Sequence, residues 1–191
     1  MNILVCIKQV PDTTEIKIDP VKHTLIREGV PSIVNPFDAC ALEMAVRLKE
    51  KEGGKVIVIS MGPAQAKNAL KECLAVGADQ AFLVTDRAFG GSDTLATSYI
   101  LSRAIAAVEA KTGEKFDLIF CGKQAIDGDT AQVGPEIAEH MDLPHVTLAT
   151  AVEMADGKLH VTRDTDEGHD LVEVSLPALV TVTKTTYDPR Y

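Results

Sequence analysis

The sequence has no apolar run close to the roughly 20 residues that cross a bilayer, which argues against membrane insertion. It is also poor in basic residues, with 19 Lys and Arg against 28 Asp and Glu and a net charge of −9. That balance disfavours nucleic-acid binding, because phosphate binding draws on clustered Lys and Arg. The four cysteines form no Cys-x-x-Cys pair, which argues against a zinc site or a disulfide framework. Together with a first apolar stretch too short for a signal peptide, this predicts a reduced, cytoplasmic protein.

The usual fingerprints of catalysis and nucleotide binding are missing as well. There is no Walker pattern and no Gly-x-Gly-x-x-Gly. The five histidines lack metal-binding spacing, and no Ser-His-Asp or Cys-His arrangement is evident. We therefore predict no metal site and no catalytic side chain. The remaining composition, 46% hydrophobic and 25% charged over 191 residues, is typical of a globular protein, and we expect one domain over residues 1–191.

Short apolar runs alternate with helical patterns along most of the chain. The predicted strands span residues 3–7, 56–60, 81–85 and 117–121. The predicted helices span residues 38–51, 63–76, 93–111 and 130–141. Continuous apolar strands that alternate with helices indicate a parallel sheet covered on both faces. The fold class predicted is α/β, with a doubly wound, Rossmann-like parallel sheet.

Two segments depart from this alternation. Residues 15–29 read as an inserted β-hairpin whose turn begins at Asp19-Pro20. After Val146 the helical pattern stops, and an Asp-Gly pair at 156–157 indicates a tight hairpin turn. The strands predicted there span residues 148–154, 158–163, 171–176 and 178–183. We expect this last quarter to form an antiparallel extension of the sheet.

Ligands of open parallel sheets bind beyond the carboxyl ends of the strands, so the loops at those ends matter most. The loop at 122–134 is long, bears glycines and leads into a helix, with Asp129 and Gln132 as a predicted cap and its partner. A helix start suits a phosphate group, although a capped loop without a ligand fits the spacing equally well. The loop at 90–94 opens a second helix, with Ser92 or Asp93 as its cap.

Two pairs of residues at these strand ends have competing interpretations. Asp127 and Asp129 have the spacing of a carboxylate pair, but helix capping or ribose binding fits them better than catalysis. Cys6 and Cys121 follow strands, and small core residues of this kind are more common than reactive thiols.

In these segments the chain resembles the β subunit of electron transfer flavoprotein. The shared sequences are VCIKQVPD at 5–12, VNPFD at 34–38, MGP at 61–63, LAVGAD at 74–79, GKQAIDGDTAQVGP at 122–135 and LPALVTV at 176–182. The resemblance covers nearly the whole chain. It implies a Rossmann-like fold of the adenine nucleotide α-hydrolase type and an adenine nucleotide bound by this subunit.

The resemblance also implies which residues contact the nucleotide. These are Cys6, Asn35, Pro36, Phe37, Asp38, Met61, Gly122, Lys123, Gln124, Ala125, Ile126, Asp127, Gly128, Asp129, Thr130, Ala131, Gln132 and Val133. The segment 86–97 resembles the loop over the second flavin of the electron-bifurcating members, which adds Gly91, Ser92, Asp93 and Thr94. That segment and the small polar residues at 127–135 favour the bifurcating class.

For that class, the family implies that FAD on this subunit takes a hydride from NADH. One electron then passes to ferredoxin or flavodoxin, and the other to an FAD held by the α subunit. An acyl-CoA dehydrogenase or a similar flavin dehydrogenase is the further partner implied. The alternative is a non-bifurcating carrier in which AMP is a structural ligand. An adenine-nucleotide sensor or hydrolase ranks last, because no fingerprint for chemistry on ATP is present.

The chain departs from the family pattern at its end. Family members continue past the sequence DPRY, which here occupies residues 188–191 and ends at Tyr191. The resemblance therefore implies a chain truncated at its C-terminus, proteolysed there, or diverged to a short form. Because the strands at 171–176 and 178–183 are apolar enough to need cover, we expect the isolated chain to self-associate or to bind its α subunit weakly.

Overall fold

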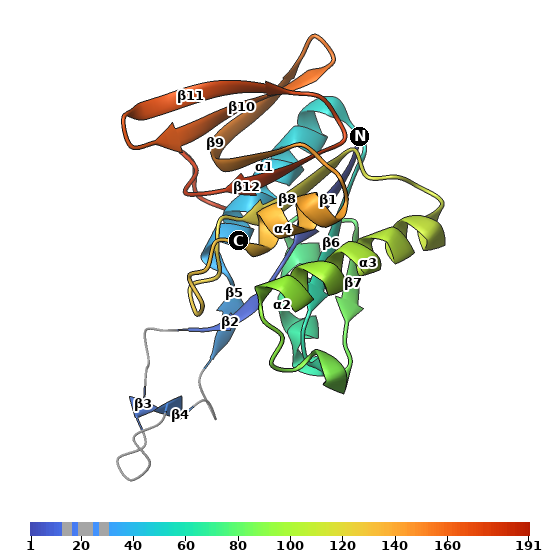
Figure 1. Ribbon diagram of the computed structural model, residues 1–191, viewed down its shortest axis with the longest axis vertical. Coiled ribbons are helices and arrows are strands. Elements are labelled where there is room, and N and C mark those ends of the chain that lie inside the picture. The colour runs from blue at the N-terminus through green and yellow to red at the C-terminus, as the bar shows by residue number, and fades with distance from the viewer. Residues whose placement is uncertain (13–16, 19–24, 27–30) are drawn as a thin grey trace.

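The computed structural model describes residues 1–12, 17–18, 25–26 and 31–191. Its centre is an eight-stranded sheet in the order β11-β10-β9-β12-β8-β1-β6-β7 (Figure 1). The strands are β1 (Asn2–Cys6), β6 (Lys55–Met61), β7 (Gln80–Val84), β8 (Leu118–Gly122), β9 (His145–Ala155), β10 (Lys158–Thr165), β11 (Gly168–Val174) and β12 (Ala178–Val182). All neighbours from β9 to β7 pair in parallel, which confirms the α/β class predicted from the sequence.

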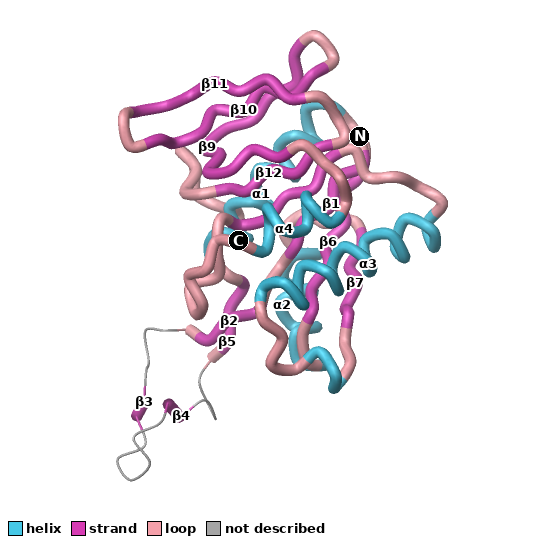
Figure 2. Tube along the Cα trace, in the orientation of Figure 1, coloured by secondary structure: helices cyan, strands magenta, loops and turns pink. Residues whose placement is uncertain are grey.

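Helices cover both faces of the parallel strands, as the continuous apolar strands require (Figure 2). The helices are α1 (Pro36–Glu52), α2 (Lys67–Ala75), α3 (Thr94–Thr112) and α4 (Val133–His140), with single 3-10 turns η2 (Ala64–Ala66) and η3 (Arg87–Phe89). α1 and α2 share one buried cluster with alternate residues of the strands, and α3 and α4 share the other. The doubly wound arrangement is therefore observed, with two cores separated by one sheet.

Local signals account for the ends of α1 and α3. α1 starts with Pro36, whose fixed φ suits the first helical position, and ends at Gly53. α3 starts after Asp93, whose carboxylate accepts a hydrogen bond of 2.8 Å from the backbone N–H of Ala96. It ends at Gly113, which adopts the left-handed conformation with φ of 73°.

The strand order reverses between β1 and β8. From β1 the chain moves outward on one side through β6 and β7, and it then returns to place β8 on the other side of β1. In open α/β sheets such a reversal leaves a crevice at the carboxyl ends of the two strands, where ligands bind. The fold thus points to the residues that follow Cys6 and Gly122.

The C-terminal strands correct one prediction. β9, β10 and β11 form antiparallel pairs, as expected for an extension of the sheet. The prediction that residues 178–183 belong to that antiparallel extension is wrong. This segment forms β12, which inserts between β8 and β9, is parallel to both and is buried throughout. Its apolar residues are therefore covered within the chain. At this end of the sheet the edge strand is β11, where Leu171 is 70% exposed.

The helix predicted over 130–141 begins three residues later, at Val133. Its N-cap position is Gln132, so the prediction that Asp129 caps this helix is wrong. Asp129 and Ala131 adopt φ angles of 51° and 53°, which turn the backbone away from a helical path before Gln132. An additional feature that sequence patterns did not predict is the short antiparallel pair of β2 (Gln9–Pro11) with β5 (Ser32–Val34).

The predicted hairpin at 15–29 is only partly within the described residues. β3 (Lys17–Ile18) and β4 (Leu25–Ile26) pair in antiparallel fashion, as a hairpin requires. The turn predicted at Asp19-Pro20 lies outside the described residues. Among those residues no helix combines the length and the apolar character that crossing a membrane would need.

Candidate functional site

Asp38 lies at the centre of the crevice between β1 and β8. This residue of the first turn of α1 is 7% exposed. One carboxylate oxygen accepts the backbone N–H of Lys8, just after β1, at 2.7 Å, and the other accepts that of Gly122, the last residue of β8, at 3.1 Å. A Cβ at Gly122 would lie 2.3 Å from Oδ1 of Asp38, so only glycine permits this approach.

The surroundings of Asp38 change its acidity. Burial raises the pKa of this carboxyl from 3.8 to about 7, against the opposing effect of the hydrogen bonds from Lys8, Asn35 and Gly122. The side chain therefore changes charge near neutral pH. Elsewhere in the described part of the chain, hydrogen bonds from basic side chains lower the pKa of Glu43, Glu50 and Glu173 instead.

Asn35 connects the start of α1 to the loop after β8. Its backbone N–H donates to the carbonyl of Lys8 at 2.9 Å. Its side-chain amide donates to the carbonyl of Gln124 at 2.8 Å and accepts the N–H of Ile126 at 3.2 Å. Asn35 occupies the N-cap position of α1, but its side chain makes no capping bond and binds the loop instead.

The loop itself is held by two exposed side-chain contacts. Nζ of Lys8 lies 2.6 Å from a carboxylate oxygen of Asp127, and Nε2 of Gln124 donates to Asp129 at 2.6 Å. Asp127 and Asp129 thus engage separate partners, which does not support a catalytic carboxylate pair. Lys8 was not among the predicted site residues, although its place directly after the first strand is a usable signal.

The second predicted loop meets the first at the starts of α3 and α4. Oγ1 of Thr94 donates to Oε1 of Glu136 at 3.2 Å and lies 3.4 Å from Oε1 of Gln132. Ser92 donates to the carbonyl of Phe89 at 2.8 Å, so Asp93 rather than Ser92 is the cap of α3. The structure therefore brings the 91–94 and 122–133 segments together, and the contact with Glu136 was not predicted.

Several other predicted residues line the same edge. Met61 ends β6 and is half-buried, and the half-buried ring of Phe37 lies 5.3 Å from Nζ of Lys123. The N–H of Lys123 donates to the carbonyl of Val182 at 2.7 Å, which joins this loop to β12. Exposed residues of the edge are Pro36, Gly91, Asp93, Asp127, Gly128, Asp129, Thr130, Ala131 and Gln132; the half-buried ones include Ala125, Ile126 and Val133.

The two cysteines at this edge are buried. Cys6 and Cys121 are free thiols of neighbouring strands in the same core cluster. Hydrogen bonding with Cys6 and burial raise the pKa of the Cys121 thiol well above its usual range. A protonated thiol is a poor nucleophile, so Cys121 packs as a small core side chain, and Cys6 packs beside it in the same cluster. Within the described residues no cluster of His, Cys, Asp or Glu is arranged for a metal ion.

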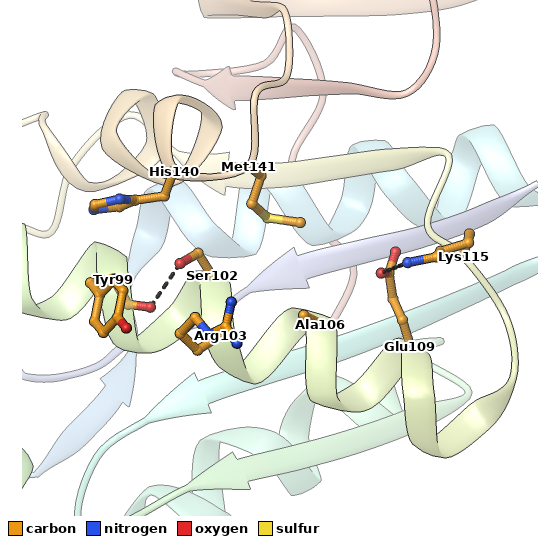
Figure 3. Close-up of a pocket in the computed structure, with 8 residues that line it drawn as sticks. All are labelled: Tyr99, Ser102, Arg103, Ala106, Glu109, Lys115, His140 and Met141. Atoms are coloured by element: carbon orange, nitrogen blue, oxygen red, sulfur yellow. Dashed lines mark hydrogen bonds and ion pairs between the residues drawn. The ribbon is translucent and has the colours of Figure 1, made fainter.

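A pocket of about 300 Å³ lies elsewhere, between α3 and the end of α4 (Figure 3). Its lining residues are Tyr99, Ser102, Arg103, Ala106, Glu109, Lys115, His140 and Met141. The rings of Tyr99 and His140 meet edge to face at 5.7 Å. None of the predicted site residues lines this pocket, because the site lies at the opposite, N-terminal ends of the two helices.

Comparison with known proteins shows the family to which the chain is similar. The model of the electron transfer flavoprotein domain matches residues 22–191. The chain is 59% identical over 191 residues to the electron transfer flavoprotein subunit beta of Thermoanaerobacterium thermosaccharolyticum, and 58% identical over 191 residues to that of Clostridium acetobutylicum. Each alignment covers 100% of this chain and 71% of the relative.

A third relative is named for a larger assembly. The caffeyl-CoA reductase-Etf complex subunit CarD of Acetobacterium woodii is 54% identical over 192 residues, which cover 100% of this chain and 71% of the relative. These matches extend over the β1–β8 crevice, both loops and the C-terminal strands. The chain therefore belongs to the electron transfer flavoprotein family, among relatives that are its β subunits.

Proposed function

We propose that the chain is an electron-transfer subunit that binds an adenine nucleotide at the carboxyl ends of β1 and β8, with the phosphates near residues 129–133. The family of β subunits implies an α subunit as its partner. The observation that carries the placement is the start of α4. There Asp129 and Ala131 adopt left-handed backbone conformations, which are costly for residues other than glycine and concentrate at functional sites.

The groups at this edge fit a nucleotide. Among the described residues, nothing accepts a hydrogen bond from the backbone N–H groups of Thr130, Ala131 and Gln132. These donors adjoin the positive end of the α4 dipole, which favours a phosphate. The hydroxyl of Ser60, at the carboxyl end of β6, is buried and also lacks a partner among the residues that the structure describes. Open donors and an unpaired buried hydroxyl at one edge are features that a polar ligand satisfies.

FAD is the nucleotide that we favour. The α3 start adjoins the α4 start through Thr94 and Glu136, so a dinucleotide can extend from one helix N-terminus toward the other. Bound FAD would supply hydride acceptance from NADH and the transfer of single electrons to ferredoxin or flavodoxin and to the α subunit. The residues of this chain would bind and orient it, since the redox chemistry belongs to the cofactor.

AMP as a structural ligand of a non-bifurcating carrier is the second candidate. The α4 start and the Asn35-anchored loop are sufficient for a mononucleotide, and they do not need the α3 start. An acyl-CoA dehydrogenase or a similar flavin dehydrogenase would be the redox partner in either case. A visible spectrum with a nucleotide count, on the protein co-expressed with its α subunit, separates the two candidates. Two FAD per heterodimer supports the first, whereas one FAD and one AMP refutes it.

Gly128 allows a direct test of the placement. It is exposed, and a Cβ added to it would have no other atom within 4 Å, so a larger side chain can start there without a clash. We expect Gly128→Leu to leave the thermal stability unchanged and to empty the site of nucleotide. Ala110→Leu, on the exposed face of α3, is the matched control. Unchanged nucleotide content in the Gly128 variant would show that the placement is wrong.

The α3 start tests the choice of FAD. We expect Asp93→Ala combined with Thr94→Ala to reduce FAD content more than AMP content, because only the longer ligand would reach that loop. The contact from Thr94 to Glu136 also steadies the start of α4, so some loss of AMP is expected from that variant. Equal losses of FAD and AMP would contradict the assignment.

A further inference from the structure

We propose that Asp38 is a positioning residue: it does not touch the nucleotide, and its buried carboxylate holds the loop at 122–127 in the geometry that binds it. The identity of the ligand in this inference rests on the proposed function. The contacts by which Asp38 and Asn35 hold the loop, called the brace below, do not depend on it. The geometry is a three-way junction. Asp38 lies on α1, and its two carboxylate oxygens accept the N–H groups of Lys8, two residues after β1, and Gly122, the last residue of β8.

The oxygens of Asp38 are already committed to the protein. Each accepts a backbone N–H, and the side chain is enclosed. The absence of a Cβ at Gly122 lets the carboxylate reach the end of β8, so β8 cannot shift without opening this contact. A buried carboxylate that accepts two backbone donors locks both donors in place, because either donor would otherwise be left unpaired.

Asn35 extends the brace along the loop. Its amide holds the carbonyl of Gln124 and the N–H of Ile126, a few residues before the strained positions at 129 and 131. Asn35 and Asp38 are the N-cap and an early position of the same helix, so the loop is positioned from one rigid element. Asp38 and Asn35 thus hold the loop at residues 122, 124 and 126, just before the open N–H groups at 130–132.

The brace requires an ionised Asp38. A protonated carboxyl presents an O–H toward one of two N–H donors and gives up one hydrogen bond. The charged and titratable groups that act on Asp38 or feel its charge, among the described residues, are Lys8 after β1, Cys73 on α2 and Cys121 on β8. Of these groups, only Lys8 favours the charged form. Acidification through neutral pH is therefore expected to loosen the loop.

Asp38→Asn keeps the shape and removes the charge. One amide nitrogen then faces a backbone donor, and we expect hydrogen exchange at Gly122 and Ile126 to accelerate. We expect the affinity for FAD, or for AMP if AMP is the ligand, to fall by about tenfold or more, the equivalent of one hydrogen bond to a charged group. The wild-type affinity should fall from about pH 8 to about pH 6, and the variant should lose most of this dependence, because the pKa of Asp38 lies at about 7.

The matched control is Asp117→Asn. Asp117 accepts the N–H of Asn2 at 2.7 Å and so also ties down a backbone donor of β1, but at the opposite edge of the sheet. The Asp117→Asn variant should leave hydrogen exchange at residues 122–127 and the pH profile of nucleotide binding unchanged. Asn35→Ala is a second variant, which removes the bonds from Asn35 to Gln124, Ile126 and Asp38 but introduces no charge beside Asp38; it should also release the loop.

The outcomes separate this inference from the proposed function. If the wild-type chain binds neither FAD nor AMP, the proposed function fails, and hydrogen exchange still decides whether Asp38 braces the loop. If nucleotide binds and both its affinity and its pH profile survive Asp38→Asn, the positioning role is overturned. Unchanged protection at Gly122 and Ile126 in both the Asp38 and the Asn35 variants overturns the brace itself.

Discussion

Replacing Arg190 by Ala should lower the stability of the whole chain by releasing residues 184–191 from α1. Arg190 binds a carboxylate that is otherwise enclosed: the side chain of Glu43 is 2% exposed. The guanidinium donates to Glu43 through Nε at 2.7 Å and through Nη2 at 3.1 Å, and the backbone N–H of Arg190 adds a bond of 3.2 Å. Glu43 also accepts Nε of Arg47 at 2.6 Å.

The expected loss of stability follows from the hydrogen bonds that Glu43 loses when Arg190 is removed. Removing one partner of a buried ion pair costs about 3–5 kcal/mol. Here the side chain of Arg190 is 36% exposed, and Glu43 keeps Arg47, so we expect a smaller loss of about 2 kcal/mol. For a chain of 191 residues this corresponds to a decrease in Tm of roughly 4–8 °C.

The same variant should change the response to acid. The guanidinium groups of Arg190 and Arg47 overcome burial and lower the pKa of Glu43 from 4.5 to about 2. Because the folded pKa is lower, Glu43 contributes stability that is complete above about pH 4.5 and is lost as the pH falls toward 2. Arg190→Ala should reduce this contribution, so the difference between variant and wild type should shrink on acidification across that window.

Thermal and urea unfolding, measured by circular dichroism from about pH 2.5 to about pH 7, test both expectations. Glu50→Gln is the control, because Glu50 is an exposed partner of the same guanidinium and its loss should matter much less. Arg190→Lys should give an intermediate loss, since an ammonium cannot reproduce the forked contact. A Tm within about 1 °C of wild type for Arg190→Ala, with an unchanged acid profile, would refute the reasoning.

Three further predictions concern the residues around the crevice. Gly122→Ala forces a Cβ to 2.3 Å from Asp38, so we expect a loss of about 1–3 kcal/mol in urea unfolding and a reduced nucleotide content; wild-type values for both would contradict the packing. Asp93→Ala removes the cap of α3 and should cost about 1 kcal/mol in the same assay, while Asp93→Asn should retain most of it. Because the pKa of Asp38 rises from 3.8 to about 7 on folding, the folded chain binds the proton more tightly, so the contribution of Asp38 to stability should decline as the pH rises from about 4 to about 7, and Asp38→Asn should abolish that part of the decline.

Much of the architecture was predictable from local patterns. Apolar runs of β-branched residues marked the parallel strands, and the Asp156-Gly157 pair marked the β9–β10 turn, because these signals act within a few residues. The cap at Asp93 was one of the two residues predicted on such local grounds, whereas α1 starts at Pro36, two residues before the predicted range of 38–51. The loop before α4 was less predictable. Asp129 is a residue type that commonly caps helices, but here it adopts a left-handed conformation and the helix starts later.

Only the tertiary structure decided how distant segments combine. The insertion of β12 between β8 and β9 depends on the competition of whole strands for partners, which no local pattern encodes. Asp38 meets Lys8 across 30 residues and Gly122 across 84, and Glu43 meets Arg190 across 147. The sequence by itself determined the α/β class, the two loops and the edge at which they lie. The folded chain determined that one buried carboxylate joins the central strands there, because burial and hydrogen bonding arise only once those strands are adjacent.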